Sequence, residues 1–257
     1  MTDPLSLRIS RRVERVVRGV WRNFGIDSLT GQHIHPREDL VRLGSDYGGW
    51  VVPYTLLDRN SVCYCAGAGE DITFDLALAE RFGCEIHVFD PTPRAVAHVE
   101  RVAAGNPLIH FHPVGLWDCE ATLKFYAPAN PAHVSHSVLN LQHTDTYFEA
   151  RCRSLADLMQ RNGHDCLDLL KIDIEGAEYR VLQSMLEKRI RPRILCVEFD
   201  EAVQRVTRAV RARVKRSVGS LLDSGYTLVA QEGRANYMCS GCGIGRQGHD
   251  RSRLARN

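Results

Sequence analysis

The sequence predicts an α/β fold in which a mostly parallel sheet is covered by helices on both faces. Short apolar runs alternate along the chain with segments of helical periodicity, the order that is typical of parallel sheets. Of the 257 residues, 44% are hydrophobic and 25% are charged, as in a globular domain. A chain of this length also buries a full core without disulfides or metal ions.

Apolar runs bounded by glycine, proline or polar residues indicate the strands. The expected parallel strands cover residues 61–66, 85–89, 108–114, 167–174 and 194–199. A closing strand pair is expected at 226–231 and 235–239, across the turn Glu232-Gly233. A further short strand is expected at 121–126, and residues 127–147, rich in Pro, Asn, His and Ser, are expected to form a loop.

Apolar residues at three- and four-residue steps indicate the helices that follow these strands. The expected helices lie at 70–82, at 93–104, directly after Ser154, around 177–185 and at 201–217. Pro93 suits the first turn of its helix. Ser154 and Asp157 have the spacing of a capping box.

Residues 7–24 have the pattern of a basic amphipathic helix, with arginines on most of the faces that its apolar residues leave. We interpret it as a helix packed on the domain, with contact to a membrane surface or nucleic acid as the alternative. The expected organisation is an N-terminal helical extension over 1–45, one domain over 46–245, and a disordered basic tail over 246–257.

Several features bear on the compartment and the partners. No window approaches ~18 uninterrupted apolar residues, so no membrane-spanning helix is expected. Arginines interrupt every apolar stretch between Leu5 and Phe24, so no signal peptide is expected. The nine cysteines are not spaced as a disulfide framework, and we expect reduced thiols in a cytoplasmic protein. The net charge of only +2 gives no reason to expect a nucleic-acid partner.

A glycine turn after the first strand is the most informative motif. The run Cys63-Tyr-Cys-Ala-Gly-Ala-Gly69 leads from a strand through two glycines into a helix. In open α/β sheets this edge binds ligands, because bare backbone approaches them closely. Asp90 follows at the tip of the next strand, where an acid accepts hydrogen bonds from both ribose hydroxyls of a nucleoside cofactor.

Two cofactors use this geometry, and the neighbouring residues favour one of them. A dinucleotide requires a third glycine, where this chain has Ile72. Glu70 and Asp71 place negative charge where a pyrophosphate would bind a helix N-terminus. S-adenosylmethionine carries no phosphate and is cationic at its sulfur and amine. The sequence therefore favours S-adenosylmethionine over NAD.

Several motifs, in order over roughly residues 43–240, together resemble the FkbM-type family of S-adenosylmethionine-dependent methyltransferases. They are Leu43-Gly-Ser-Asp-Tyr-Gly-Gly-Trp, Gly69-Glu-Asp-Ile-Thr-Phe-Asp, Val88-Phe-Asp-Pro-Thr-Pro, Pro113-Val-Gly-Leu-Trp and Leu170-Lys-Ile-Asp-Ile-Glu-Gly-Ala-Glu. The resemblance implies a Rossmann-like, seven-stranded methyltransferase sheet with a reversed final hairpin. It also implies a hydroxyl oxygen as the methyl acceptor.

The glycine turn and the family pattern together indicate the cofactor-binding residues. These are Gly49, Cys65, Gly67, Gly69, Glu70, Asp71, Asp90, Pro91, Gly115, Leu116 and Asp173. The chain departs from the pattern at Cys63 and Cys65, where many methyltransferases have an acid and a glycine. The turn Tyr47-Gly48-Gly49-Trp50 is interpreted either as a flap over the site or as an ordinary turn held by Trp50.

Asp173, Glu175 and His136 are the candidate catalytic residues. Asp173 lies at the strand tip that faces the methyl group in this fold, and Glu175 follows it in the same turn. Either acid could orient the cofactor amine or the substrate, or act as a base. His136 lies in the loop after the third strand, and a neutral imidazole suits removal of a hydroxyl proton. Glu198 and Asp200 end the fifth strand, and alternation decides which of them faces the site.

No metal site is expected from the sequence. The pairs His33-x-His35 and His110-x-His112 have the spacing of metal ligands but lack a third and fourth ligand. Cys239-x-x-Cys242 is likewise a single pair.

The sequence thus predicts an S-adenosylmethionine-dependent methyltransferase that acts on a hydroxyl of a small molecule or saccharide. The alternatives are a protein of the same fold that binds the cofactor with little or no catalysis, and an NAD-dependent oxidoreductase. The acceptor and the oligomeric state are not indicated by any residue.

Overall fold

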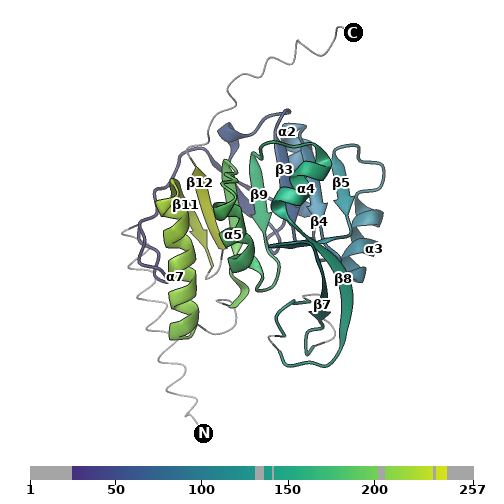
Figure 1. Cartoon of the computed structure of the whole chain (residues 1–257). Helices are drawn as coiled ribbons and strands as arrows, with labels where there is room; N and C mark the ends of the chain where they lie inside the picture. The colour runs from purple at the N-terminus through teal and green to yellow at the C-terminus, as the bar shows by residue number, and fades with distance from the viewer. Residues whose placement is uncertain (1–24, 131–135, 141, 202–205, 234–235, 242–257) are drawn as a thin grey trace.

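Seven strands form the central sheet of the computed structural model (Figure 1), which describes residues 25–130, 136–140, 142–201, 206–233 and 236–241. In sheet order the strands are β11 (Tyr226–Glu232), β12 (Asn236–Gly241), β10 (Ile194–Glu198), β9 (Leu169–Ile172), β3 (Val62–Ala66), β4 (Glu85–Phe89) and β5 (Ile109–His112). The five strands from β10 to β5 are mutually parallel, and β12 is antiparallel to both β10 and β11. The mostly parallel sheet with a reversed final hairpin is therefore confirmed.

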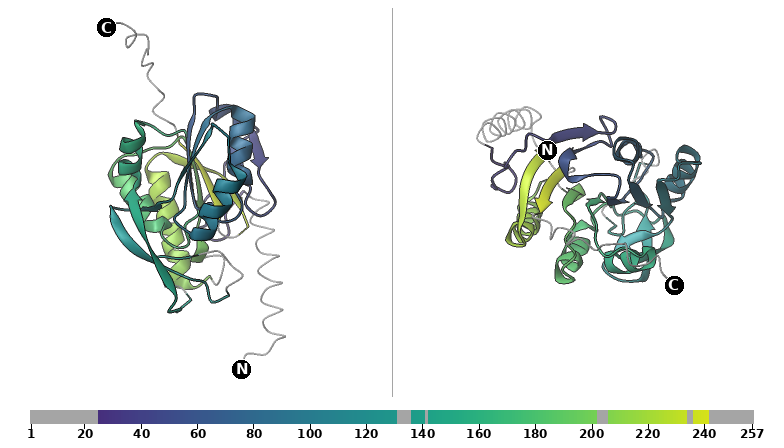
Figure 2. Two further views of the ribbon diagram at one scale, coloured as in Figure 1. Left: turned by 90° about the vertical axis from the view of Figure 1, so that its right-hand side faces the viewer. Right: turned by 90° about the horizontal axis from the view of Figure 1, so that it is seen from above.

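Helices cover both faces of this sheet, as Figure 2 shows from above. The helices are α2 (Thr73–Phe82), α3 (Pro93–Val102), α4 (Leu155–Asn162), α5 (Glu178–Glu187) and α7 (Arg208–Asp223), with a short 3-10 turn, η1 (Tyr54–Leu56). Apolar residues of α4, α5 and α7 pack on one face of the sheet. Those of α2 and α3 pack on the other. Because the crossovers bury both faces, the central strands are almost wholly apolar.

The helix expected at 201–217 is confirmed over 208–217, but α7 begins later, at Arg208, and ends later, at Asp223. The Thr207 side chain accepts a hydrogen bond from the Val210 amide and caps the helix. Apolar residues at helical spacing then continue as far as Leu221, which is buried against the sheet. The cap and this stripe set the ends of the helix.

Two further sheets were not expected. The segment β1 (Leu40–Leu43) pairs with β2 (Trp50–Pro53), and both pack on the α2 face. The other sheet contains β6 (Gly115–Trp117), β8 (Tyr147–Ser154) and the expected extra strand, β7 (Ala121–Tyr126). In Figure 1, β7 and β8 project together beyond the central sheet. Both extra sheets border the site described below.

Part of the sequence-based expectation falls outside the described residues. This applies to the basic helix at 7–24, the tail at 246–257, and the loop residues His133 and Ser135. The described segment that precedes β1 contacts the sheet, where the Tyr237 hydroxyl donates to Asp27 at 2.9 Å. Among the residues that are described, no helix has the length and apolar character needed to span a bilayer.

Candidate cofactor and active site

A cavity of about 760 Å³ lies at the carboxyl ends of β3, β4, β9 and β10. This is the edge where open parallel sheets bind ligands. The sequence-predicted residues that line it are Gly67, Gly69, Glu70, Asp71, Asp90, Pro91, Gly115, Leu116, His136, Asp173 and Glu175. The fold thus gathers most of the predicted site around one space.

The glycine turn at Gly67 packs directly on the end of β9. Gly67 has φ +87°, and a Cβ there would lie 1.7 Å from the carbonyl oxygen of Asp173. Its amide donates to the Phe89 carbonyl at 3.0 Å. The turn therefore requires glycine for its own packing, whatever ligand the cavity accepts.

Asp90 is buried at the end of β4 and stabilises the same turn through hydrogen bonds. One carboxylate oxygen accepts from the amides of Ala68 and Gly69 at 2.9 and 3.0 Å. The other accepts from the Thr92 amide at 2.8 Å. A carboxylate offers about four acceptor positions, so Asp90 has acceptor capacity left toward the cavity that it lines.

Glu70 and Asp71 are both engaged at the rim. Glu70 forms a two-point ion pair with Arg94, with contacts of 2.6 and 3.1 Å. Asp71 accepts from the hydroxyls of Ser45 and Thr73. Ser45 Oγ in turn accepts from the Gly48 amide at 2.9 Å, so Asp71 fastens the turn that carries Tyr47 and Gly48 beside the cavity. This arrangement suits a flap, although Trp50 is also buried in the core.

Two predicted residues do not line the cavity. Gly49 serves its own turn, because its amide bonds to the Ser45 carbonyl and a Cβ would lie 2.3 Å from that oxygen. Cys65 is buried within β3, in the apolar cluster on the α2 face of the sheet. Cys63 is buried in that cluster too, and all eight described cysteines are free thiols.

An apolar wall closes the cavity on the side of the small sheet. Pro91, Gly115, Leu116 and Phe125 line this side. A Cβ at Gly115 would lie 2.7 Å from Cys152 Sγ, so β6 approaches β8 only because the residue is glycine. The wall offers flat apolar surface, of the kind that an aromatic base packs against.

The opposite side, toward β9 and β10, is acidic. Asp173, Glu175, Glu198 and Asp200 line it together with the cation Lys171. The buried Lys171 ammonium donates to the Gly67 carbonyl at 2.6 Å and lies 3.2 Å from Asp173. Burial, reinforced by the charge of Asp173, raises the pKa of Glu198 to about 8.

Asp200, on the acidic side of the cavity, forms a buried carboxyl pair with Glu178. Glu178 accepts from the amides of Ile174 and Gly176 at 3.1 and 2.9 Å. Burial raises the pKa of Glu178 to about 7 and raises that of Asp200. No N–H or side-chain hydroxyl of the described residues reaches Glu178 Oε2 or Asp200 Oδ2. A proton shared between the two carboxyls satisfies both oxygens.

The turn that presents Glu175 has an uncommon conformation. Glu175 has φ +56°, a region that residues other than glycine rarely occupy. Its carbonyl accepts a hydrogen bond from the Ser137 hydroxyl, and His136 next to Ser137 also lines the cavity. The fold therefore brings His136 and Glu175, which are far apart in the sequence, to the same place.

The structure adds lining residues that no local motif indicates. Asn236 reaches the cavity because β12 runs antiparallel to β10, in a register that pairs Asn236 with Glu198. Asn130 and Gln142 come from the loop between β7 and β8. The position of Asn236 depends on strand pairing, for which the predicted hairpin is the available signal. Asn130 and Gln142 lie within the loop that the sequence predicts at 127–147.

The sheet order, the reversed β12, and the glycine turn with an acid after the next strand define a Rossmann-like methyltransferase domain. The family model described as "Methyltransferase FkbM domain" matches residues 63–217, more than half of the chain. The chain therefore belongs to the FkbM methyltransferase domain family.

The individual proteins that the chain resembles share about a third of their aligned residues with it or fewer. The human "Probable methyltransferase-like protein 24" is 31% identical over 131 residues, which cover 50% of this chain and 29% of that protein. The rat protein of the same name is 30% identical over 124 residues, with 48% and 28% covered. The chain thus spans less than a third of these curated relatives. The crystal structure of methyltransferase FkbM from Methylobacillus flagellatus KT has a TM-score of 0.45 at 13% identity, covering 72% of this chain and 44% of that one.

Family membership implies S-adenosylmethionine as the cofactor, and the side chains that line the cavity fit this molecule. Buried Asp90 has acceptor capacity for hydroxyl groups, and Pro91 and Leu116 offer apolar surface. Carboxylates outnumber cations on the side of β9 and β10, which suits a ligand with a sulfonium and an amine.

Proposed function

We propose that the protein transfers a methyl group from S-adenosylmethionine to a hydroxyl oxygen of a small molecule or a saccharide. One observation carries the proposal: a single cavity joins the acid and glycine turn at the ends of β4 and β3 to a group of carboxylates at the ends of β9 and β10. Its volume of about 760 Å³ lies within the range of about 300–1,000 Å³ that is usual for small-molecule sites.

We assign the cofactor to the part of the cavity between Asp90 and Asp173. Asp90 accepts hydrogen bonds from the ribose, while Gly67 and Gly69 leave the backbone open to the ligand. Pro91, with Gly115 and Leu116, flanks the adenine. Glu70 and Asp71 shape the rim, and Gly49 and Cys65 support the site from outside the cavity wall. This assignment rests on the lining residues and on their order along the sheet edge.

When bound, S-adenosylmethionine supplies an electrophilic methyl group. The residues of this chain then have to align the acceptor and take its proton. Glu198 is the first candidate for the base, because its pKa is raised to about 8, and His136 and Glu175 are the others. The ion pair with Lys171 assigns Asp173 to orienting the ligand rather than to removing the proton.

Calorimetric titration with S-adenosylmethionine, S-adenosylhomocysteine and NAD tests the cofactor. We expect micromolar binding of both adenosyl compounds and none of NAD. Asp90→Asn should weaken adenosyl binding at least about tenfold, because it removes a charged acceptor. The exposed Asp223→Asn at the end of α7 is the matched control and should bind as the parent does. Failure of both adenosyl compounds to bind would overturn the proposal.

Acceptor chemistry needs a separate experiment. S-adenosylmethionine labelled in its methyl group is supplied with two matched panels, glycosides with free hydroxyls and the corresponding amino sugars. We expect label on the hydroxyl panel, and loss of that label in Glu198→Gln. Label confined to the amino panel would refute oxygen as the acceptor while leaving the cofactor assignment intact.

A further inference from the structure

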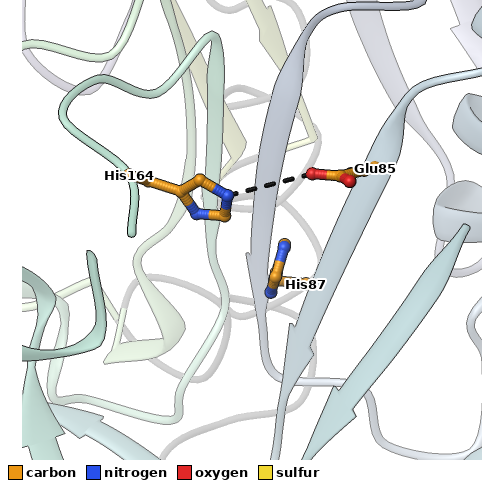
Figure 3. Close-up of side chains that lie close together, drawn as sticks. All are labelled: Glu85, His87 and His164. Atoms are coloured by element: carbon orange, nitrogen blue, oxygen red, sulfur yellow. Dashed lines mark ion pairs between the residues drawn. The ribbon is translucent and has the colours of Figure 1, made fainter. Parts of the chain in front are cut away.

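Three side chains that commonly bind metal ions meet at the opposite end of β4 from Asp90 (Figure 3). Glu85 and His87 are the first and third residues of β4, so strand alternation places them on the same face of the sheet. His164 comes from the segment directly after α4. One ligand atom from each residue lies within 4.8 Å of the other two.

His87 carries the clearest sign that a partner belongs here. Its side chain is buried, with 7% of the residue exposed. Its Nδ1 lies 3.0 Å from Nε2 of His112. Its Nε2 is also buried and has no hydrogen-bond partner within the described part of the chain. Figure 3 shows a ring nitrogen of His87 directed toward the space between Glu85 and His164. A buried nitrogen with no partner lowers stability unless something binds it.

His164 is also oriented as a metal ligand usually is, with one ring nitrogen hydrogen-bonded and the other facing the group. Nδ1 of His164 lies 2.8 Å from the Tyr64 hydroxyl, which also accepts from the Asn162 side chain at 2.9 Å. This leaves Nε2 of His164 to face Glu85, at 3.8 Å from its carboxylate. Each histidine thus has its second nitrogen hydrogen-bonded, which fixes the ring and leaves the first nitrogen for a metal ion.

We propose that Glu85, His87 and His164 bind a divalent transition-metal ion, with zinc as the ion that the donor set fits best. Two imidazole nitrogens and one carboxylate oxygen are an established ligand set for zinc, with water in the fourth position. Magnesium and calcium prefer oxygen ligands alone. The Glu85 side chain is 54% exposed, so ion and water can enter from that side.

The required movement is small. Tetrahedral zinc with bonds of about 2.0–2.1 Å keeps its ligand atoms about 3.4 Å apart. The three atoms lie within 4.8 Å of one another and therefore have to approach by at most about 1.4 Å. The exposed Glu85 can bring its carboxylate closer to both histidines by rotating its side chain.

The site is separate from the proposed methyl-transfer site. None of its three residues lines the cavity at the other end of the sheet. Bound zinc would connect the segment after α4 to the first residues of β4. Binding of the ion therefore stabilises the folded chain through linkage between binding and folding.

The test uses the whole chain, freed of metal with EDTA. Calorimetry with zinc chloride should give one site per chain, and zinc should raise the melting temperature while magnesium at the same concentration does not. Cobalt(II) should give the visible absorption of a four- or five-coordinate ion. Glu85→Gln and His164→Gln should each weaken zinc binding more than about 100-fold, because each removes a ligand.

A matched control separates this site from surface histidines. His33 and His35 are exposed and lie outside the group, so the double variant His33→Ala/His35→Ala should bind zinc as tightly as the parent. Circular dichroism of each variant serves as the control for folding. The proposal is overturned if the parent binds no zinc, or if Glu85→Gln and His164→Gln, while folded, bind it as the parent does.

Discussion

The ammonium group of Lys171 lies 3.2 Å from the carboxylate of Asp173, and both residues line the cavity. The same ammonium donates to the Gly67 carbonyl at 2.6 Å. One buried cation therefore connects the end of β9 to the glycine turn and balances part of the negative charge around it. Burial opposes this charge, yet the nearby carboxylates raise the pKa of Lys171 above its usual value.

Replacing Lys171 by methionine should destabilise the fold. The change keeps the length of the side chain but removes the ion pair and the bond to Gly67. Breaking a fully buried pair costs about 3–5 kcal/mol. We expect about 2–3 kcal/mol here, because the Asp173 side chain is 29% exposed and can be hydrated. Urea unfolding at pH 7 measures the difference. Lys215→Met, on the exposed face of α7, should change stability by less than about 0.5 kcal/mol.

The carboxyl pair of Glu178 and Asp200 predicts a pH-dependent stability. The pKa of Glu178 is raised to about 7 in the folded protein. As the pH rises from about 4.5 to 7, the unfolded chain therefore releases this proton while the folded chain keeps it. The free energy of unfolding should fall by about 2–4 kcal/mol over pH 5–8 from this source.

Glu178→Gln should remove much of that fall. The amide oxygen can still accept from Ile174 and Gly176, and the amide nitrogen can donate toward Asp200, as the protonated acid does. Urea unfolding from pH 5 to 8.5 should give a flatter profile than the parent, with higher stability at the alkaline end. Glu187→Gln, exposed on the same helix, should retain the parental slope. An unchanged slope in Glu178→Gln would locate the pH dependence elsewhere.

The position of Glu198 predicts that the affinities for S-adenosylmethionine and S-adenosylhomocysteine depend differently on pH. This can be tested without knowing the acceptor. S-adenosylmethionine is cationic at sulfur, and S-adenosylhomocysteine is neutral there. Because burial raises the pKa of Glu198 to about 8, this group becomes negative between pH 7 and 9. Over that range the affinity ratio of the methionine to the homocysteine form should therefore rise about three- to tenfold more in the parent than in Glu198→Gln, on the order of 1 kcal/mol.

The sulfonium also lowers the pKa of the amine in S-adenosylmethionine relative to that in S-adenosylhomocysteine, and comparison with Glu198→Gln removes this contribution of the ligands themselves. Glu198→Gln should show only the pH dependence that comes from the ligands, whereas Glu80→Gln, exposed on α2, should follow the parent. Calorimetry at pH 7, 8 and 9 gives all the values needed. The same pH dependence in Glu198→Gln as in the parent would mean that Glu198 does not face the sulfur.

The central sheet was predictable because its strands are local features. The expected strand at 85–89 coincides with β4, since the apolar run lies between the helix-ending Gly83 and Pro91. The strand β8 was missed because charged residues alternate along it, leaving no apolar run. The start of α7 was placed too early, since periodicity alone does not reveal a cap such as Thr207.

The candidate site likewise contains residues that local motifs indicate and residues that only the fold brings together. Gly67 and Asp90 belong to a strand–turn–helix motif and its following strand, so spacing alone indicates them. The contacts of Asn236 and of the Glu178–Asp200 pair depend on the register of separate strands. The proximity of His164 to His87 depends on where α4 ends over the sheet. No local pattern contains that information, which is why the sequence predicts no metal site.

The glycine turn gives the last prediction. Gly67→Ala forces a side chain into a left-handed conformation and places its Cβ 1.7 Å from the Asp173 carbonyl, so the turn has to move away from β9. Gly105→Ala is the matched control, because Gly105 also has a positive φ, +77°, but has nothing within 4 Å of the added carbon. The control should lose about 1–2 kcal/mol through conformation alone. Gly67→Ala should lose at least about 3 kcal/mol and also bind S-adenosylhomocysteine more weakly. Equal losses in urea unfolding would show that the turn tolerates a side chain, and that its contact with Asp173 does not set its position.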